Sequence, residues 1–144
     1  NKMAITQAVC SSFKRELLGG THNFNNGGDV FKVALYTSQA TLSAATTSYT
    51  TGNEVSASGQ YVAKGGVLAG QTTSLSATVA IVDFANRSFT GVTLTARGAL
   101  IYNSTDARKA VAVLDFGADK TATSGTFTIQ FPNFTRAAAI LRIA

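Results

Sequence analysis

The run A-R-G-A-L-I-Y-N-S-T-D-A-R-K-A-V-A-V-L-D-F-G, residues 96–117, decides the fold class. Two apolar segments within it, 99–102 and 110–116, have the length and residue types of β-strands. Between them lie the polar residues 103–106, N-S-T-D, whose side chains favour turns. The run therefore predicts an antiparallel hairpin that is closed by a polar loop.

Further strand-like segments lie on both sides of this hairpin. Residues 30–37, V-F-K-V-A-L-Y-T, alternate with the period of two that is typical of a strand. Other strands are expected at 79–84, 92–95, 126–131 and 138–143, with short ones at 61–68 and 72–76. Pro132 is expected to end the strand before it. This pattern predicts a mainly β fold, an antiparallel β-sandwich of jelly-roll-like form over about residues 29–144.

A faint internal repeat is visible among these strands. V-A-I-V-D-F-A at 79–85 resembles V-A-V-L-D-F-G at 111–117, and a polar turn follows each. The repeat has two interpretations. It marks two equivalent β-motifs of one sandwich, or it reflects the small set of residues from which buried strands are made.

The N-terminal residues 4–18 predict one amphipathic helix. Apolar side chains recur at spacings of three and four, and Gly19-Gly20 follows as a stop signal. The stripe either packs on the rest of the domain or docks on a partner. On the second interpretation it is a candidate interface, made of Ile5, Val9, Phe13 and Leu17.

Residues 41–58 carry little periodic pattern and predict a long surface loop. Loops of this length are usually functional or disordered. Tyr49, one of the few large side chains in this stretch, is therefore added to the candidate interface.

Composition narrows the classes of function. The 144 residues fit a single domain, 1–144, and only 13% of them are charged, against about 25% in an average soluble domain. The net charge of +5 comes from scattered basic residues that form no patch or stripe, so we do not expect nucleic-acid binding. No apolar run approaches the roughly 20 residues of a membrane span, and the N-terminus lacks the features of a signal peptide. We expect a soluble protein with no membrane contact.

Residues that could carry chemistry are few. His22 is the only histidine and Cys10 the only cysteine, and we expect a small buried cysteine rather than a Cys–His pair. Asp83 and Asp115 recur in the same V-x-D-F frame, as a carboxylate pair or, as we favour, as turn-forming side chains. No ligand spacing typical of metal sites and no phosphate-binding loop occurs. We therefore expect no enzymatic activity, no metal, no cofactor and no small-molecule substrate.

Several phrases of the chain resemble a group of small proteins encoded by tailed bacteriophages. The similar segments are M-A-I-T-Q-A-V-C-S-S-F-K-R-E-L-L-G-G-T-H-N-F at 3–24, D-V-F-K-V-A-L-Y-T-S at 29–38, A-R-G-A-L-I-Y-N-S-T at 96–105, K-A-V-A-V-L-D-F-G-A-D-K at 109–120 and the C-terminal A-A-I-L-R-I-A. The resemblance spans most of the chain outside 40–75. It implies a structural protein of the virion and carries over no functional residues.

Two roles in a virion are compatible with these features. The first is a capsid decoration (cement) protein that braces the head by binding the major capsid protein. The alternative is a tail, neck or baseplate/fibre component that contacts other tail proteins or the host. Because β-architectures leave edges that must be covered, we expect a homo-oligomer, preferably a trimer. The expected location is the virion, which is assembled in the cytoplasm of the bacterial host.

Overall fold

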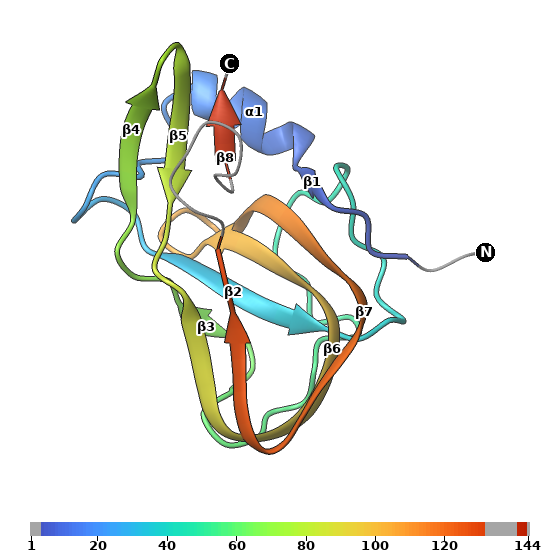
Figure 1. Cartoon of the computed structure of the whole chain (residues 1–144). Helices are drawn as coiled ribbons and strands as arrows, with labels where there is room; N and C mark the ends of the chain where they lie inside the picture. Colours follow the sequence, from blue (N-terminus) through green and yellow to red (C-terminus); the bar gives the residue numbers. More distant parts are fainter. Residues whose placement is uncertain (1–3, 132–140, 144) are drawn as a thin grey trace.

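The structure is a computed structural model that describes residues 4–131 and the backbone of 141–143 (Figure 1). Strands make up 50% of the chain and helix 6%, and all ladders between the named strands are antiparallel. The prediction of a mainly β fold with antiparallel sheets and one helix is confirmed. The elements, in chain order, are β1 (Ala8–Val9), α1 (Ser11–Leu18), β2 (Phe31–Tyr36), β3 (Gly66–Val67), β4 (Thr72–Ser76), β5 (Val79–Asp83), β6 (Arg87–Asn103), β7 (Lys109–Ile129) and β8 (Leu141–Ile143).

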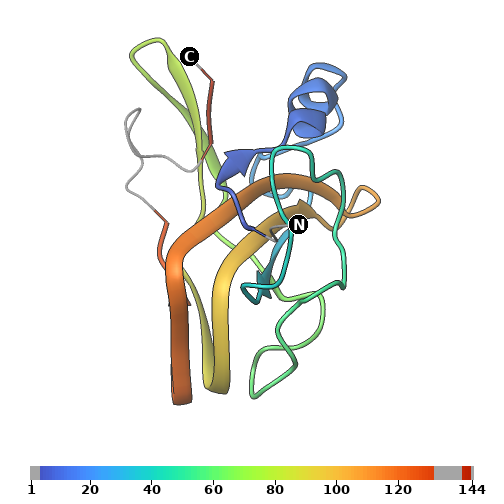
Figure 2. The same cartoon turned by 90° about the vertical axis from the view of Figure 1, so that its right-hand side faces the viewer.

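The hairpin of β6 and β7 is the centre of a five-stranded sheet with the order β1-β7-β6-β2-β3. The predicted hairpin is confirmed, with its loop at residues 104–108 and not at 103–106, because Asn103 pairs with Lys109. The segments 92–95 and 99–102, predicted as separate strands, belong to the single strand β6. Both strands bend strongly (Figure 2), and the register between them shifts between Phe89 and Leu94. Gly91 and Ser124 have left-handed backbones there, which lets the pair fold over while the ladder continues.

The core lies against β2, which pairs with β6 over its whole length. Phe31, Val33 and Leu35 are fully buried, as the alternation predicts. Ala34 and Tyr36 are fully buried as well, so both faces of this strand are covered. All its side chains except the partly buried Lys32 are packed in the interior, which explains the apolar character of the segment.

A second sheet contains three strands in the order β4-β5-β8. A two-residue turn with Ala77 in a left-handed backbone joins β4 to β5, and this hairpin projects from the body of the molecule (Figure 1). The two members of the internal repeat therefore lie in different sheets, one as β5 and one within β7. Their different positions favour the second interpretation, in which the similarity reflects the small set of residues from which buried strands are made.

The helix predicted for 4–18 is confirmed only from Ser11 to Leu18, and the prediction is wrong for residues 4–10. Ile5 bridges Leu42 instead, and β1 pairs with Ala112 and Val113 of β7. The peptide groups of this stretch thus take partners across the fold, which helical periodicity cannot register. The end of α1 agrees with the prediction, because the Gly19 N–H bonds back to the carbonyl oxygens of Arg15 and Glu16.

At the C-terminus the predicted strand 126–131 is the end of β7, which stops at Ile129. Of the predicted strand 138–143, residues 141–143 form β8, and 138–140 lie outside the described residues. The predicted strand end at Pro132 also lies outside them.

Candidate functional site

Two residues of the candidate interface are buried in the domain. Phe13 packs its ring 4.8 Å from that of His22 and 5.8 Å from that of Phe24. Ile5 lies against the backbone of β6 at Gly98, where a Cβ atom would come within 2.8 Å of the Ile5 side chain. Both side chains thus contribute to the core.

The other three candidates are partly exposed and pack against the same core. Val9 lies in β1 and Leu17 in α1, whereas Tyr49 lies on a different segment, beside Glu54 and Tyr102. The structure therefore does not gather the five residues into one exposed patch. Their role as an interface stays a prediction.

Cys10 and His22 do not form a nucleophile pair in this structure. Cys10 is fully buried, with its Sγ 4.0 Å from the carbonyl oxygen of Ser43. Burial, and then the negative charge of Glu16, raise the pKa of the thiol to about 11. At neutral pH the sulfur is therefore a protonated thiol, which is a poor nucleophile.

His22 instead cross-links elements that are distant in the chain. Its Nε2 lies 3.0 Å from a carboxylate oxygen of Glu16, and its Nδ1 lies 3.0 Å from the side-chain amide of Asn103. Because that amide nitrogen can only donate, Nδ1 accepts and Nε2 carries the proton that is donated to Glu16. The fully buried Asn103 also donates to Asp29, and its own oxygen accepts the N–H groups of residues 105 and 106. This network holds the connector 21–29 to the β6–β7 turn.

The two aspartates of the V-x-D-F frame bond to nearby backbone. Asp83 accepts the N–H of Phe84 at 2.9 Å, and Asp115 accepts the N–H of Gly117 at 2.9 Å. They lie on strands of different sheets. These contacts agree with the interpretation as turn-forming side chains.

A tyrosine cluster surrounds Glu54 and was not foreseen from the sequence. It comprises all four tyrosines of the chain, Tyr36, Tyr49, Tyr61 and Tyr102. The hydroxyl of Tyr49 donates to one carboxylate oxygen of Glu54. The other oxygen accepts from the Tyr61 hydroxyl at 2.6 Å and from the N–H of Lys64 at 2.9 Å. A single carboxylate thus joins three points of one segment.

The remaining contacts of the tyrosine cluster tie that segment to the five-stranded sheet. The Tyr61 oxygen accepts the N–H of Leu35 in β2 at 2.8 Å, and the Tyr102 hydroxyl of β6 donates to the carbonyl of Lys64. Burial, and then the charge or hydrogen bond of Glu54, raise the pKa of all four hydroxyls, that of Tyr102 to about 12. All four phenols are therefore protonated at neutral pH and act as donors. We refer to the tyrosine cluster and Glu54 together as the latch, because their hydrogen bonds hold residues 38–65 against the five-stranded sheet.

The segment held by these contacts, residues 38–65, contains the stretch 41–58 that was predicted as a surface loop. Of the short strand predicted at 61–68, only Gly66–Val67 forms a strand, β3. The segment 38–65 contains little regular structure, yet Leu42 and Val55 are buried in the core. The Val55 N–H bonds to the Leu35 carbonyl at 2.9 Å, and the Ala110 N–H bonds to the Thr47 carbonyl at 3.0 Å. The segment is therefore a packed layer of the domain rather than a free excursion.

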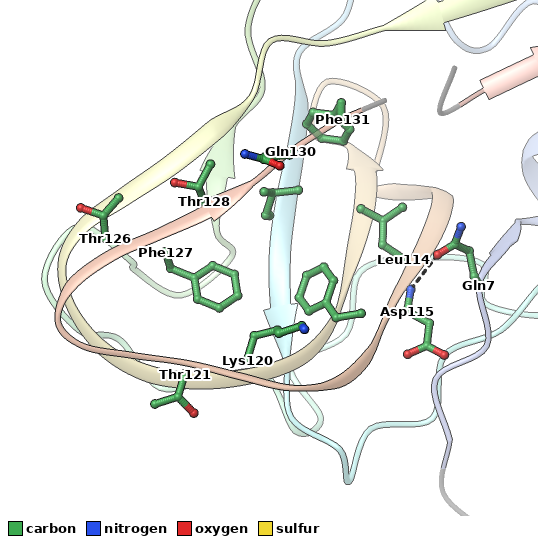
Figure 3. A pocket seen from close by; sticks show the side chains of 12 residues that line it. Gln7, Leu114, Asp115, Lys120, Thr121, Thr126, Phe127, Thr128, Gln130 and Phe131 are labelled. Atoms are coloured by element: carbon green, nitrogen blue, oxygen red, sulfur yellow. Dashed lines mark hydrogen bonds between the residues drawn. The ribbon is translucent and has the colours of Figure 1, made fainter. Parts of the chain in front are cut away.

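A hollow of about 460 Å³ lies along the bent strand β7 (Figure 3). Three aromatic rings line it, those of Phe116, Phe127 and Phe131, and the first two have centroids 6.0 Å apart. Its charged residues are one acid, Asp115, and one base, Lys120. This combination of side chains defines no reaction.

Among the helices and strands whose side chains the structure describes, β4 is the most exposed. The side chains of residues 72–75 are exposed, and Leu75 retains 71% of its surface in contact with solvent. Among the described residues β4 pairs only with β5, so within that part of the chain its other edge has no strand partner. No charged residue occurs between Lys64 and Asp83. We refer to this free side of Thr72–Ser76 as the β4 edge.

Among residues 4–131 no group of three or more His, Cys, Asp or Glu side chains is placed to hold a metal ion. The helix of the described chain is too short to cross a membrane. No protein-family model, curated protein or solved structure matches this chain.

Proposed function

We propose that this chain is a structural protein of a tailed-phage virion that acts through protein–protein contacts, as a capsid decoration protein. The resemblance of its segments to small phage-encoded proteins supports the virion setting. The observation that carries the proposal is the β4 edge, a five-residue strand without a neighbour on one side among the described residues.

An open strand edge favours association for a simple reason. Its unpaired N–H and C=O groups are a template for a further strand, and proteins that avoid such pairing place charges, prolines or bulges at the edge. Thr72–Ser76 contains none of these, and Leu75 adds exposed apolar surface. An edge of this kind suits a protein whose role is to be assembled with others.

The decoration role assigns the partners as the major capsid protein and further copies of this chain, at a location on the head. It requires no catalysis, cofactor or small-molecule substrate. The jelly-roll-like sandwich is part of the same proposal, with the five-stranded and three-stranded sheets as its two layers. Density that resolves the chain on an intact particle tests two points: whether the two sheets form the layers of a sandwich, and where on the head the protein binds.

Purified virions of the phage that encodes this chain provide the direct test. We expect mass spectrometry to find the protein in gradient-purified particles at a copy number comparable to that of the major capsid protein, and cryo-electron microscopy to place it on the head. A low copy number with density at the neck, baseplate or fibres would transfer the protein to the tail. Its absence from particles would refute the virion role.

A test for hydrolytic activity complements this experiment. We expect no clearing of host cell wall in a zymogram. If clearing occurs and is lost in the variants Asp83→Asn and Asp115→Asn, the protein is an enzyme and the structural proposal is wrong.

A further inference from the structure

The sequence of the β4 edge allows it to pair with the β4 edge of a second copy of the chain in antiparallel orientation. Read in opposite directions, T-T-S-L-S aligns with a second copy so that residue 72 faces 76, residue 73 faces 75, and Ser74 faces Ser74. In an antiparallel ladder, residues whose peptide groups point to one neighbour alternate with residues whose groups point to the other. In the alignment centred on Ser74, the residue numbers of any two facing residues differ by zero, two or four. Outward-pointing groups of one copy therefore always meet outward-pointing groups of the other.

Side chains are compatible with the same alignment. Leu75 of one copy lies opposite Thr73 of the other and diagonal to the second Leu75, within reach of a long side chain. Pairing would thus remove from water the one large apolar side chain of the strand, which is 71% exposed in the single chain. No other side chain of Thr72–Ser76 is larger than threonine, so none obstructs the approach.

We propose that the β4 edge binds a second copy of this chain, as an antiparallel strand across a twofold axis centred on Ser74. The two three-stranded sheets then join into one sheet with the order β8-β5-β4-β4-β5-β8. The hairpin of β4 and β5 projects from the body (Figures 1 and 2), so the hairpins can meet before the bodies do. The inference rests on the proposed function for its setting and adds the identity of one partner.

Charge supports a second copy as the occupant. Each chain has a net charge of +5, so two copies repel each other at most approaches. Residues 65–82 carry no charge, which allows two identical surfaces to meet there without like-charge contacts. A strongly acidic or basic partner would find no complementary group on this strand.

The size of the contact sets the expected affinity. A pair of five-residue strands is far smaller than a standard interface of about 1,600 Å², so the free dimer is expected to be weak. Copies bound side by side on a particle have a high effective concentration, which makes a weak contact sufficient there. A twofold contact closes with two copies, so this edge gives a dimer and not the trimer expected from the sequence.

Charges placed on the twofold axis test the inference. In a homodimer of Ser74→Lys or of Ser74→Glu, the new charged side chain faces the same side chain of the second copy, at a Cβ separation of about 5 Å. We expect sedimentation of the unaltered chain to show a monomer–dimer equilibrium at concentrations up to about 1 mM. Each variant should weaken this dimer about tenfold or more, and an equimolar mixture of the two should restore it as a heterodimer. The matched controls Ser56→Lys and Ser56→Glu, on an exposed serine outside β4, should leave the dimer unchanged.

Four results would overturn the inference. These are a monomer throughout the concentration series, a trimer, a dimer that tolerates both Ser74 variants, or a mixture that fails to restore association. The outcome of the virion experiment is interpreted independently of the outcome for the dimer. A monomer that is nevertheless found on particles removes only this inference, whereas a dimer that is never found on particles removes only the proposed function.

Discussion

Segment 38–65 and the β4–β5 hairpin follow one another in the chain and are held in opposite ways. The segment has almost no regular secondary structure, yet the tyrosine cluster and long-range backbone hydrogen bonds fix it to the sheet. The hairpin has a regular ladder, yet the side chains of residues 72–75 are exposed, and one edge has no strand partner in the part of the chain that the structure describes. Regular hydrogen bonding and burial are thus separate sources of order. Here the irregular segment is fixed to the sheet, whereas the regular hairpin has one edge without a strand partner among the described residues.

The largest effect should follow from removing the acceptor at the centre of the tyrosine cluster. Glu54→Ala leaves the hydroxyls of Tyr49 and Tyr61 and the N–H of Lys64 without their partner. The Tyr61 hydroxyl is buried and the Tyr49 hydroxyl is partly buried, whereas water can reach the N–H of the exposed Lys64. At 1–3 kcal/mol for an unsatisfied buried group, we expect the free energy of unfolding to fall by about 3 kcal/mol in urea titrations. Glu54→Gln, which keeps one acceptor oxygen, should lose less. The exposed Asp119→Ala should change stability by less than about 0.5 kcal/mol, and an equal loss in both alanine variants would contradict the latch.

A smaller loss is expected when one hydroxyl of the cluster is removed. Tyr61→Phe deprives the buried N–H of Leu35 of its acceptor and Glu54 of a donor, which should cost about 2 kcal/mol. Tyr36→Phe makes the same chemical change, but it frees only the carbonyl of the exposed Thr50, which water can reach. We expect about half the loss there, measured by the same urea titrations. Equal losses would mean that burial of the partner does not matter at this site.

Alkaline pH should act on the latch and not on the hairpin. The pKa values of all four tyrosines are raised above 10 in the folded chain, that of Tyr102 to about 12. The unfolded chain therefore releases these protons first, and stability falls as the pH rises from about 10 towards 12. Residues 65–82 contain no titrating side chain. We expect tyrosine ionisation, followed by ultraviolet absorbance, to coincide with unfolding, and four freely titrating phenols in the folded protein would exclude the cluster.

Thiol labelling directly compares the reactivity of a buried position with that of an exposed position in β4. Cys10 is fully buried and its pKa is raised to about 11, so reagents should modify it only after unfolding. In the variant Ser74→Cys at low protein concentration we expect one thiol per chain to react quickly, and the second to react only in denaturant. Fast modification of Cys10 in the unaltered chain would show that β1 and α1 do not shield it.

The smallest effect on stability is expected in the hairpin itself. Leu75→Ala removes a side chain that is already 71% exposed, so the free energy of unfolding should change by less than about 0.5 kcal/mol. The same change should weaken self-association, because the diagonal pair of Leu75 side chains is lost. A loss of more than 1 kcal/mol in the monomer would mean that β4 is part of the core and would remove the contrast between the two regions.

Features that depend on neighbouring residues could be predicted from the sequence. The alternation of 30–37 and the polar loop at 103–106 identified β2 and the β6–β7 hairpin, because a strand's period and a turn's chemistry are local properties. Gly19-Gly20 marked the end of α1 for the same reason. The absence of charge from 65–82 is likewise a property of the sequence alone.

Contacts between distant residues could be decided only by the tertiary structure. Residues 4–10 have a helical pattern but are extended, because Leu42 and β7 supply partners for their peptide groups. The four tyrosines are scattered over 67 positions, from Tyr36 to Tyr102, and no spacing among them indicates that Glu54 is their common centre. The sequence also cannot show that, among the described residues, β4 has β5 as its single neighbouring strand. Which edge stays open depends on the order of strands in the sheet, and that order is set by packing across the whole chain.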